Sequence, residues 1–198
     1  MKLNWVERLV VNSPGRVLMQ RVEIRRLRAM MALDPGATVL ELGCGRGVGA
    51  RLIAETFSPA TIHALDLDLV MVRKARATLP SHHHNVRLYV ADGTMLPFKS
   101  GSMDAVFSFG ILHHIPDWRR AVAEISRVLG KGGRFYLEEL YPGAYQNVLT
   151  SRILVHPTQD RFWGDDLRAV ISQCGMDIKA ATEFKWFGIL GVAVKGNL

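Results

Sequence analysis

The chain has 198 residues, of which 48% are hydrophobic and 22% are charged, and its formal net charge is +7. This length suits one domain with a full core, and the composition is that of a globular protein rather than a disordered one. No apolar run reaches the roughly 18–20 residues of a membrane span, and two cysteines cannot form a four-cysteine metal site. We therefore expect a reduced, cytoplasmic protein without a metal centre.

Residues 3–33 have helical periodicity, interrupted at residues 12–15 by a turn sequence. The apolar stripe of the longer second helix comprises Val17, Ile24, Leu27 and Met31. Residues 1–36 also hold seven basic and three acidic side chains, so most of the positive charge is local.

Three interpretations of this N-terminal segment stay open. It is a helix packed on the domain with a solvated arginine face, a lid whose Trp5 or Met19 meets the substrate, or a contact with an anionic membrane surface or nucleic acid. The sequence has no RNA-binding module and no zinc finger, which argues against nucleic acid.

The most informative stretch is residues 37–50. A short apolar run around Val39 and Leu42 predicts a buried strand, and residues 48–57 return to helical spacing. Between them, glycines occupy four alternate positions, 43, 45, 47 and 49. A strand, a glycine turn and a helix bring backbone N–H groups up to a ligand, so we expect a binding loop here.

Two ligands are compatible with this loop. Gly45, Gly47 and Ala50 satisfy a relaxed dinucleotide fingerprint, with Asp66 at a suitable distance for a ribose. However, Glu41 precedes the first glycine, in the pattern Glu-x-Gly-x-Gly-x-Gly. An acid at this place suits a ligand with an ammonium group better than one with a pyrophosphate.

Further strands end in acids that could face the same ligand. Residues 60–65 predict a strand ending at Asp66, and Asp68 is placed to cap the next helix. Residues 86–91 predict a strand ending at Asp92 and Gly93, where an acid can accept from an adenine amino group. The three histidines at 82–84 are consecutive in a loop, and we interpret them as solvated rather than metal-binding.

The rest of the chain continues the alternation of strands and helices. We expect strands at about 103–109, 133–139, 176–183 and 187–195, and helices after Asp117 and around Asp165 and Asp166. The last two strands would form an antiparallel pair. The sequence therefore predicts an α/β fold with a doubly wound seven-stranded sheet.

Five short motifs occur in a characteristic order and spacing: Val39–Gly47, Ala64–Asp66, Ala91–Phe98, Leu112–Asp117 and Arg127–Arg134. In this arrangement the chain resembles the class I S-adenosylmethionine-dependent methyltransferases, in the broad small-molecule branch (methyltransferase type 11) that includes quinone-methylating enzymes. The resemblance implies strand order 3-2-1-4-5-7-6, with the seventh strand antiparallel and helices on both faces. The resemblance covers residues 37–198, the Rossmann-like core. Together with the helical N-terminal cap at 1–36, we expect one domain, 1–198.

The resemblance assigns the cofactor S-adenosylmethionine, released as S-adenosylhomocysteine, to the glycine loop and the strand ends. Asp66 would bind the ribose, Leu67 would lie on the adenine, and Asp92 with Gly93 would read the adenine edge. The methionine part would be held by Glu41 and by the backbone of Gly43, Gly45 and Phe109. Cys44 and Gly47 of the loop would also bind the cofactor.

The resemblance further implies methyl transfer to a small, apolar or aromatic acceptor. If the acceptor needs a base, the candidates are His113, His114 and Tyr141, with His156 next, although the histidine pair could equally be structural. Two alternative functions are an NAD(P)-dependent oxidoreductase and an adenosyl-cofactor-binding protein without turnover. Peripheral membrane contact through the basic N-terminal helix is the further partner that the charge distribution allows.

Overall fold

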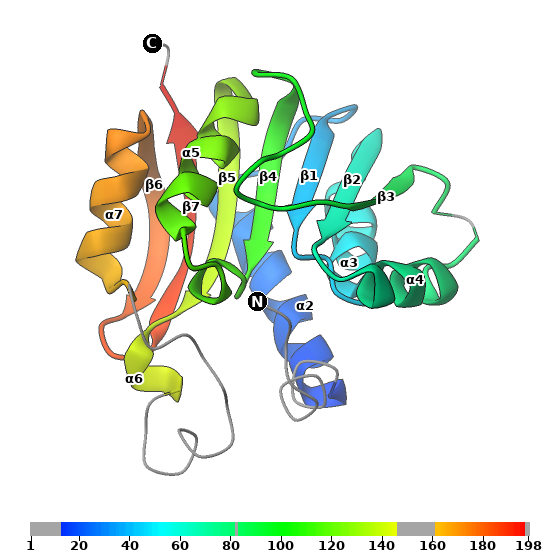
Figure 1. Ribbon diagram of the computed structural model, residues 1–198, viewed down its shortest axis with the longest axis horizontal. Coiled ribbons are helices and arrows are strands. Elements are labelled where there is room, and N and C mark those ends of the chain that lie inside the picture. The colour runs from blue at the N-terminus through cyan, green and yellow to red at the C-terminus, as the bar shows by residue number, and fades with distance from the viewer. Residues whose placement is uncertain (1–12, 82, 146–160, 197–198) are drawn as a thin grey trace.

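The computed structural model describes residues 13–81, 83–145 and 161–196 (Figure 1). The strands are β1 (Thr38–Leu42), β2 (Thr61–Asp66), β3 (Val86–Val90), β4 (Met103–Phe109), β5 (Leu129–Leu140), β6 (Met176–Phe184) and β7 (Gly188–Lys195). The helices are α2 (Pro14–Met30), α3 (Val48–Phe57), α4 (Leu69–Thr78), α5 (Trp118–Val128), α6 (Pro142–Tyr145) and α7 (Gly164–Gln173), with a short 3-10 helix, η1 (Leu112–His114).

All seven strands belong to one sheet, in the order β3-β2-β1-β4-β5-β7-β6. The pairs among β1 to β5 are parallel, whereas β7 runs antiparallel to both β5 and β6. This confirms the predicted doubly wound sheet and its strand order. The order reverses direction between β1 and β4, so the carboxyl ends of these two strands flank the crevice where ligands bind in such sheets.

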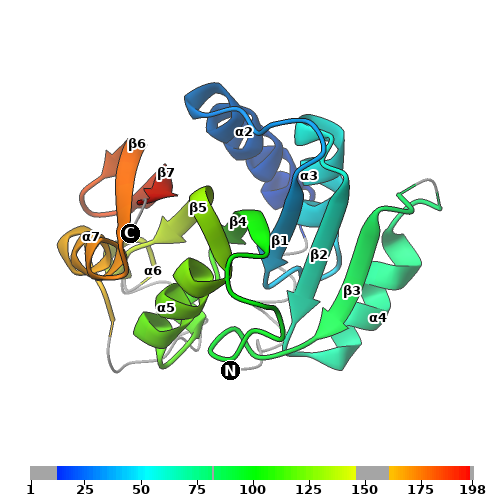
Figure 2. The ribbon, with the colours of Figure 1, turned by 90° about the horizontal axis from the view of Figure 1, so that it is seen from above.

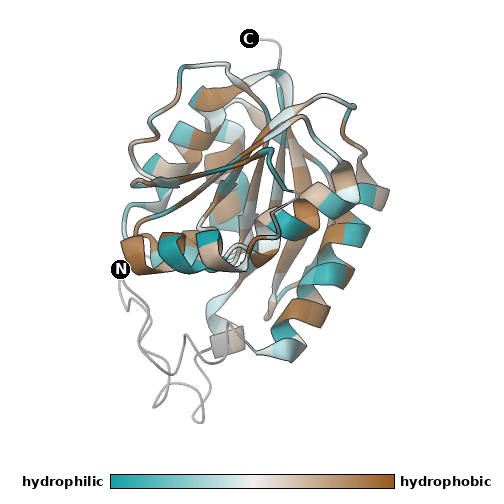
Figure 3. Cartoon of the chain, turned by 90° about the vertical axis from the view of Figure 1, so that its right-hand side faces the viewer, coloured by the Kyte–Doolittle hydropathy of each residue, from teal (hydrophilic) through white to brown (hydrophobic). Residues whose placement is uncertain are grey.

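Helices cover both faces of the sheet (Figure 2). One buried cluster joins α2, α3 and α4 to the sheet and includes Leu27, Ile53 and Ala75, while the other lies under α5 and α7. Figure 3 shows the strands largely in the hydrophobic colour between helices that carry both colours. Because both faces are covered, the central strands are apolar at nearly every position, and the polar exceptions stand out.

Local signals explain where most elements begin. Asp68 accepts a hydrogen bond from the Val70 N–H (2.9 Å) and Asp117 accepts one from the Arg120 N–H (3.2 Å), which confirms both predicted N-caps. The sequence prediction was wrong at the start of β5, which begins at Leu129 rather than at residue 133. The reason is a register shift, in which Met103 of β4 pairs with Leu129 before the regular ladder resumes at Ala105.

Helix α2 packs along the face that α3 also covers. Ile24 and Leu27 of the predicted stripe are buried, whereas Val17 and Met31 are half-buried and the third buried side chain is Gln20. Ser13 caps the helix by accepting from the Arg16 N–H. The shorter helix predicted around Trp5 lies outside the described residues. Within residues 13–81, 83–145 and 161–196, no helix combines the length and the apolarity that a membrane crossing requires.

Candidate functional site

The glycine loop connects β1 to α3 at the carboxyl edge of the sheet. Gly45 has a φ of 52°, and a Cβ built on it would meet no atom within 4 Å, so its outer side faces open space. At Gly43, with φ 74°, a Cβ would come within 2.6 Å of the Ile111 side chain, so glycine lets the loop after β4 close against it. The loop is therefore packed on one side and open to a ligand on the other.

Glu41 is a buried carboxylate beneath this loop. It accepts a hydrogen bond from the Ala50 N–H at the start of α3, and its Oε1 lies against Gly49. Its Oε2 is also buried but has no hydrogen-bond partner among the described residues. Burial raises the pKa of Glu41 to about 8, because the charged form loses its hydration. An unpartnered buried carboxylate oxygen of this kind marks a place for a hydrogen-bond donor or a cation.

Asp66 ends β2 next to the loop. Its Oδ2 accepts from the Gly45 N–H at 2.9 Å, and its Oδ1 accepts from the Asp68 N–H at 2.8 Å. The side chain therefore fixes the loop and the start of α4. Leu67, beside it, is 51% exposed, although a leucine at the end of a central strand would ordinarily be covered.

Asp92 and Gly93 follow the carboxyl end of β3, next to the end of β2. Asp92 accepts from both the backbone N–H and the hydroxyl of Thr94, at 2.8 and 2.9 Å. Gly93 is buried against Leu42, whose Cδ1 would be 2.8 Å from a Cβ at that position. The Ala91 N–H donates to the Asp66 carbonyl oxygen, so the ends of β2 and β3 stay together. Asp66, Leu67, Asp92 and Gly93 thus lie along one edge, as the sequence predicted.

A second group of polar residues lies at the carboxyl ends of β4 and β5. The carboxylate of Glu139 is fully buried, and its Oε1 accepts from the Ser108 hydroxyl and from the N–H groups of Ile111 and Leu112. Its Oε2 lies 2.9 Å from Nδ1 of His113. Because a carboxylate only accepts, the proton of a neutral His113 ring resides on Nδ1.

His114 follows on the same 3-10 helix and is buried, with its ring 4.2 Å from that of His113 between centroids. Phe109 ends β4 and stacks on Phe107 within the cluster under α2 and α3. The two histidines and Phe109 therefore converge on the turn between β4 and α5, beside the glycine loop.

Glu138, the residue before Glu139, points to the opposite face of the sheet. Its Oε2 accepts from Arg16 of α2 at 2.9 Å, and Arg16 also pairs with Glu23 at 2.6 Å. Burial raises the pKa of Glu138, and the Arg16 guanidinium opposes that rise. The sequence analysis assigned no role to either Glu138 or Glu139. The sequence signal that could have found them is the occurrence of two acids at the end of an apolar central strand, because that end faces the ligand crevice.

Tyr141 lies farther along, after β5. It is fully buried, and its hydroxyl donates to Glu183 of β6 at 2.6 Å, while Glu183 also pairs with Arg168. Burial, followed by the bond to Glu183, raises the pKa of Tyr141 above its usual range. The structure thus holds this hydroxyl within the β6–α7 region. His156 lies outside the described residues.

Residues 40–137 match the sequence profile of a family described as a methyltransferase domain, and this stretch contains the glycine loop, Asp66, Asp92 and both histidines. The chain belongs to the class I S-adenosylmethionine-dependent methyltransferases. The cofactor of the family is S-adenosylmethionine, as expected from the motifs.

Among curated relatives, this chain is 37% identical over 109 residues to the phthiotriol/phenolphthiotriol dimycocerosates methyltransferase of Mycobacterium tuberculosis. The match covers 54% of this chain and 39% of that protein. This chain is 33% identical over 124 residues to the fatty-acid O-methyltransferase of Mycolicibacterium smegmatis, covering 61% and 43%. The chain thus spans less than half the length of either relative.

Among solved structures, this chain is similar to the methyltransferase that forms a complex with the Haloferax volcanii Trm112 methyltransferase activator. The TM-score is 0.77 with 21% identity, over the full length of both chains. At this identity the likeness establishes the fold.

The residues of the methyltransferase fit its cofactor. The buried, unpartnered Oε2 of Glu41 suits an ammonium group, and the open side of Gly45 leaves room that a side chain would fill. Asp66 lies at the end of β2 and accepts from the Gly45 N–H of the loop, so a carboxylate stands beside the loop where a ribose would lie. The individual roles of these residues, and those of the catalytic candidates, stay predictions.

Proposed function

We propose that the protein binds S-adenosylmethionine at the carboxyl ends of β1, β2 and β3 and methylates a small, lipophilic acceptor at the ends of β4 and β5. The observation that carries the proposal is the Glu41 carboxylate, buried under an open glycine loop in a chain of this family. A nicotinamide cofactor fits less well, because an ammonium group favours ionisation of the buried Glu41 carboxyl whereas a pyrophosphate disfavours it. Family membership likewise favours methyl transfer over hydride transfer.

The bound cofactor supplies an electrophilic methyl group on a sulfonium, and S-adenosylhomocysteine leaves after transfer. The work of the protein is then to hold the acceptor in line and to exclude water, which can provide roughly 7–11 kcal/mol in well-oriented reactions. In our proposal Glu41 and the loop N–H groups fix the amino-acid end, Asp66 the ribose, and Asp92 with Gly93 the adenine edge. The backbone of Phe109 would also contact the methionine part.

His113 is the residue that we propose to take the acceptor proton, where the acceptor has a weakly acidic hydroxyl, amine or thiol. Glu139 holds the Nδ1 proton, so the basic lone pair is on Nε2. Glu139 is itself buried and fixed by two backbone N–H groups, so the ring orientation is set by the sheet. His114 and Tyr141 are the further candidates.

The acceptor class is supported by exposed aromatic side chains at the same edge. The turn between β6 and β7 presents Phe184, Trp186 and Phe187, which are 65%, 76% and 59% exposed, and Trp163 packs edge-on against Trp186. Phe187 accepts from the Tyr141 N–H through its carbonyl oxygen, which ties this turn to the carboxyl end of β5. Clustered exposed aromatic side chains of this kind are typical of interaction sites. Two relatives, a phthiotriol/phenolphthiotriol dimycocerosates methyltransferase and a fatty-acid O-methyltransferase, are named for lipid substrates, which supports the same acceptor class.

A reducing, cytoplasmic location is part of the proposal, supported by two cysteines that form no disulfide, Cys44 and Cys174. Peripheral contact with a membrane would bring a lipophilic acceptor to the site.

Isothermal titration with S-adenosylhomocysteine and, in parallel, with NAD+ tests the cofactor assignment. We expect saturable binding of the first and none of the second; the reverse result would overturn the proposal. An acceptor screen over fatty acids, lipid alcohols and quinols, read by release of S-adenosylhomocysteine, then tests turnover. Binding without turnover across lipophilic and polar acceptors alike would indicate a binding protein instead.

A further inference from the structure

Helix α2 is apolar on two opposite faces. Its inner face buries Ile24 and Leu27 against the sheet. Its outer face carries a second stripe at the helical spacing of four, three and four, in which Leu18, Val22 and Ala29 are apolar and Arg25 is charged. Leu18 is 64% exposed and Val22 is 45% exposed, and Met19, next to them, is 47% exposed. A helix that needs one apolar stripe for packing has no folding reason for the second.

Exposed arginines border this outer stripe. Arg21 and Arg28 lie on one side of it and Arg26 on the other. Among the described residues, none of them, nor Arg25, forms an ion pair, whereas Arg16 of the same helix pairs with Glu138 and Glu23. All four side chains are exposed.

Arg21, Arg25 and Arg28 also line a groove of about 650 Å³ between α2 and α3. The α3 side is formed by Leu52, Glu55 and Thr56. Glu55 is the acid of the groove, and its carboxylate is engaged by Arg51 at 3.0 Å. Three guanidinium groups on one wall suit a phosphate, which they can contact through paired N–H groups.

We propose that the outer face of α2 docks on a membrane surface that contains anionic phospholipids. Leu18 and Val22 enter the headgroup–acyl boundary, and a lipid phosphate occupies the groove of Arg21, Arg25 and Arg28. The net charge of +7 favours such a surface, and the exposed leucine and valine distinguish it from a nucleic acid, for which stacking aromatics would be the expected companions.

The position of α2 connects this surface to the site. On its inner side Gln20 lies close to Gly49 of the loop, and Arg16 pairs with Glu138 at the end of β5. Docking through the outer face would therefore place a lipid surface one helix away from the proposed acceptor site.

Co-sedimentation of the full chain with vesicles tests the proposal. We expect binding to phosphatidylcholine vesicles that contain about 30% phosphatidylglycerol, little binding to phosphatidylcholine alone, and loss of binding in about 0.5 M salt. Equal binding to neutral vesicles, or binding that salt does not weaken, would overturn the charge-based assignment.

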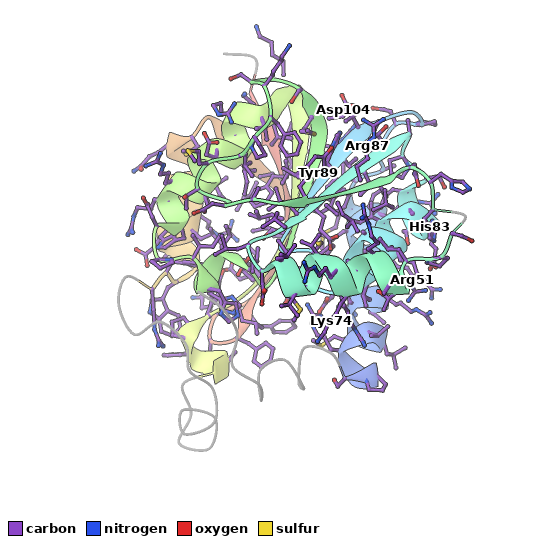
Figure 4. The ribbon with its side chains drawn as sticks, turned by 45° about the vertical axis from the view of Figure 1, so that its right-hand side comes forward. Arg51, Lys74, His83, Arg87, Tyr89 and Asp104 are labelled. Atoms are coloured by element: carbon purple, nitrogen blue, oxygen red, sulfur yellow. The ribbon has the colours of Figure 1, made fainter. Side chains whose placement is uncertain are left out.

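Two variants locate the surface. The triple variant R21Q/R25Q/R28Q should lower the vesicle partition coefficient at least about 10-fold. Each basic residue near an anionic surface raises that coefficient by a factor of roughly five. The matched control R73Q/K74Q/R76Q removes three exposed charges from α4 (Figure 4 labels Lys74) and should lower it much less. Equal losses in both variants would show a nonspecific effect of net charge and contradict the proposal.

The apolar part is tested by L18N/V22N, which keeps every charge and should also weaken vesicle binding about 10-fold. Inorganic phosphate in the binding buffer distinguishes a lipid from a soluble phosphate ligand. If inorganic phosphate bound the groove and the protein did not bind vesicles, the proposed docking on a membrane would be refuted. Binding to duplex DNA with no vesicle binding would refute it as well. Affinity for S-adenosylhomocysteine, measured on each variant, should be unchanged, so failure of this proposal and failure of the proposed function give different results.

Discussion

Arg16 and Glu138 are 122 residues apart in the sequence, yet their guanidinium and carboxylate groups lie 2.9 Å apart under helix α2. This ion pair joins the N-terminal helix to the carboxyl end of β5. Both side chains are largely buried, with 18% and 9% of their surfaces exposed. The helix is therefore attached to the site by charge as well as by its apolar stripe.

Replacing Arg16 by Gln should destabilise the protein, because it leaves a buried carboxylate without its cation. We expect the free energy of unfolding, measured by urea denaturation near pH 8, to fall by about 2–4 kcal/mol. Near pH 6 the loss should be smaller, since burial raises the pKa of Glu138 and the orphaned carboxyl can protonate. The double variant R16Q/E138Q should recover part of the loss; an additive loss would argue against the pair.

Glu41 should make stability depend on pH. Its pKa is raised from 4.5 to about 8 in the folded chain. Its contribution to the free energy of unfolding is therefore fully present below pH 4.5 and is lost as pH rises through 8. In that window the native state holds a proton that the unfolded chain has released. We expect the free energy of unfolding of E41Q to fall less steeply with pH than that of the native sequence. Parallel curves for the two proteins would contradict the buried, protonated carboxyl.

Asp66→Ala should weaken binding of S-adenosylhomocysteine by about 1–3 kcal/mol, the usual cost of losing a buried hydrogen-bonding group. The matched control is Asp104→Ala. Asp104 accepts from the Thr38 N–H at 2.7 Å, the same kind of bond, but at the opposite end of the sheet (Figure 4). Titration calorimetry should show a weaker complex for D66A and an unchanged one for D104A.

Glu139→Gln should lower kcat through His113. Gln keeps one oxygen for the N–H groups of η1 but can present an amide donor to Nδ1, which favours the wrong ring tautomer. We expect a loss of roughly 10²-fold or more in kcat, the scale of general-base catalysis, and no change in cofactor affinity. The double variant H113A/E139Q should be no slower than H113A alone, because the two residues act as a unit.

His114→Ala should likewise spare cofactor affinity if His114 serves the acceptor.

Tyr141→Phe separates a structural from a catalytic role for this candidate. Because the hydroxyl donates to Glu183 at 2.6 Å, we expect the free energy of unfolding to fall by about 1 kcal/mol and kcat to stay unchanged. A large drop in kcat with unchanged stability would instead place the hydroxyl in the reaction.

The parts of the site that the sequence predicted are those set by local chain geometry. The glycines, Glu41 and Asp66 follow one strand and the next at fixed spacing, and parallel strands bring those ends to one edge. The strand order itself came from the resemblance, since strand-and-helix alternation alone does not place β7 between β5 and β6.

The acids of β5 were missed for a different reason. The partner of Glu138 is Arg16, which the sequence analysis counted within a local excess of positive charge, and the partner of Glu139 is His113. Both pairings cross between elements that are distant in the sequence. Two consecutive carboxylates at a strand end also resemble a solvated terminus, and tertiary packing alone reveals that each points into a different buried face.

Positions 41 and 49 are sterically coupled. A Cβ at Gly49 would overlap the Glu41 carboxylate, so alanine at 49 requires that the carboxylate move or that residue 41 be shorter. A library that randomises both positions and selects for folded protein should accordingly return a long acid only beside glycine.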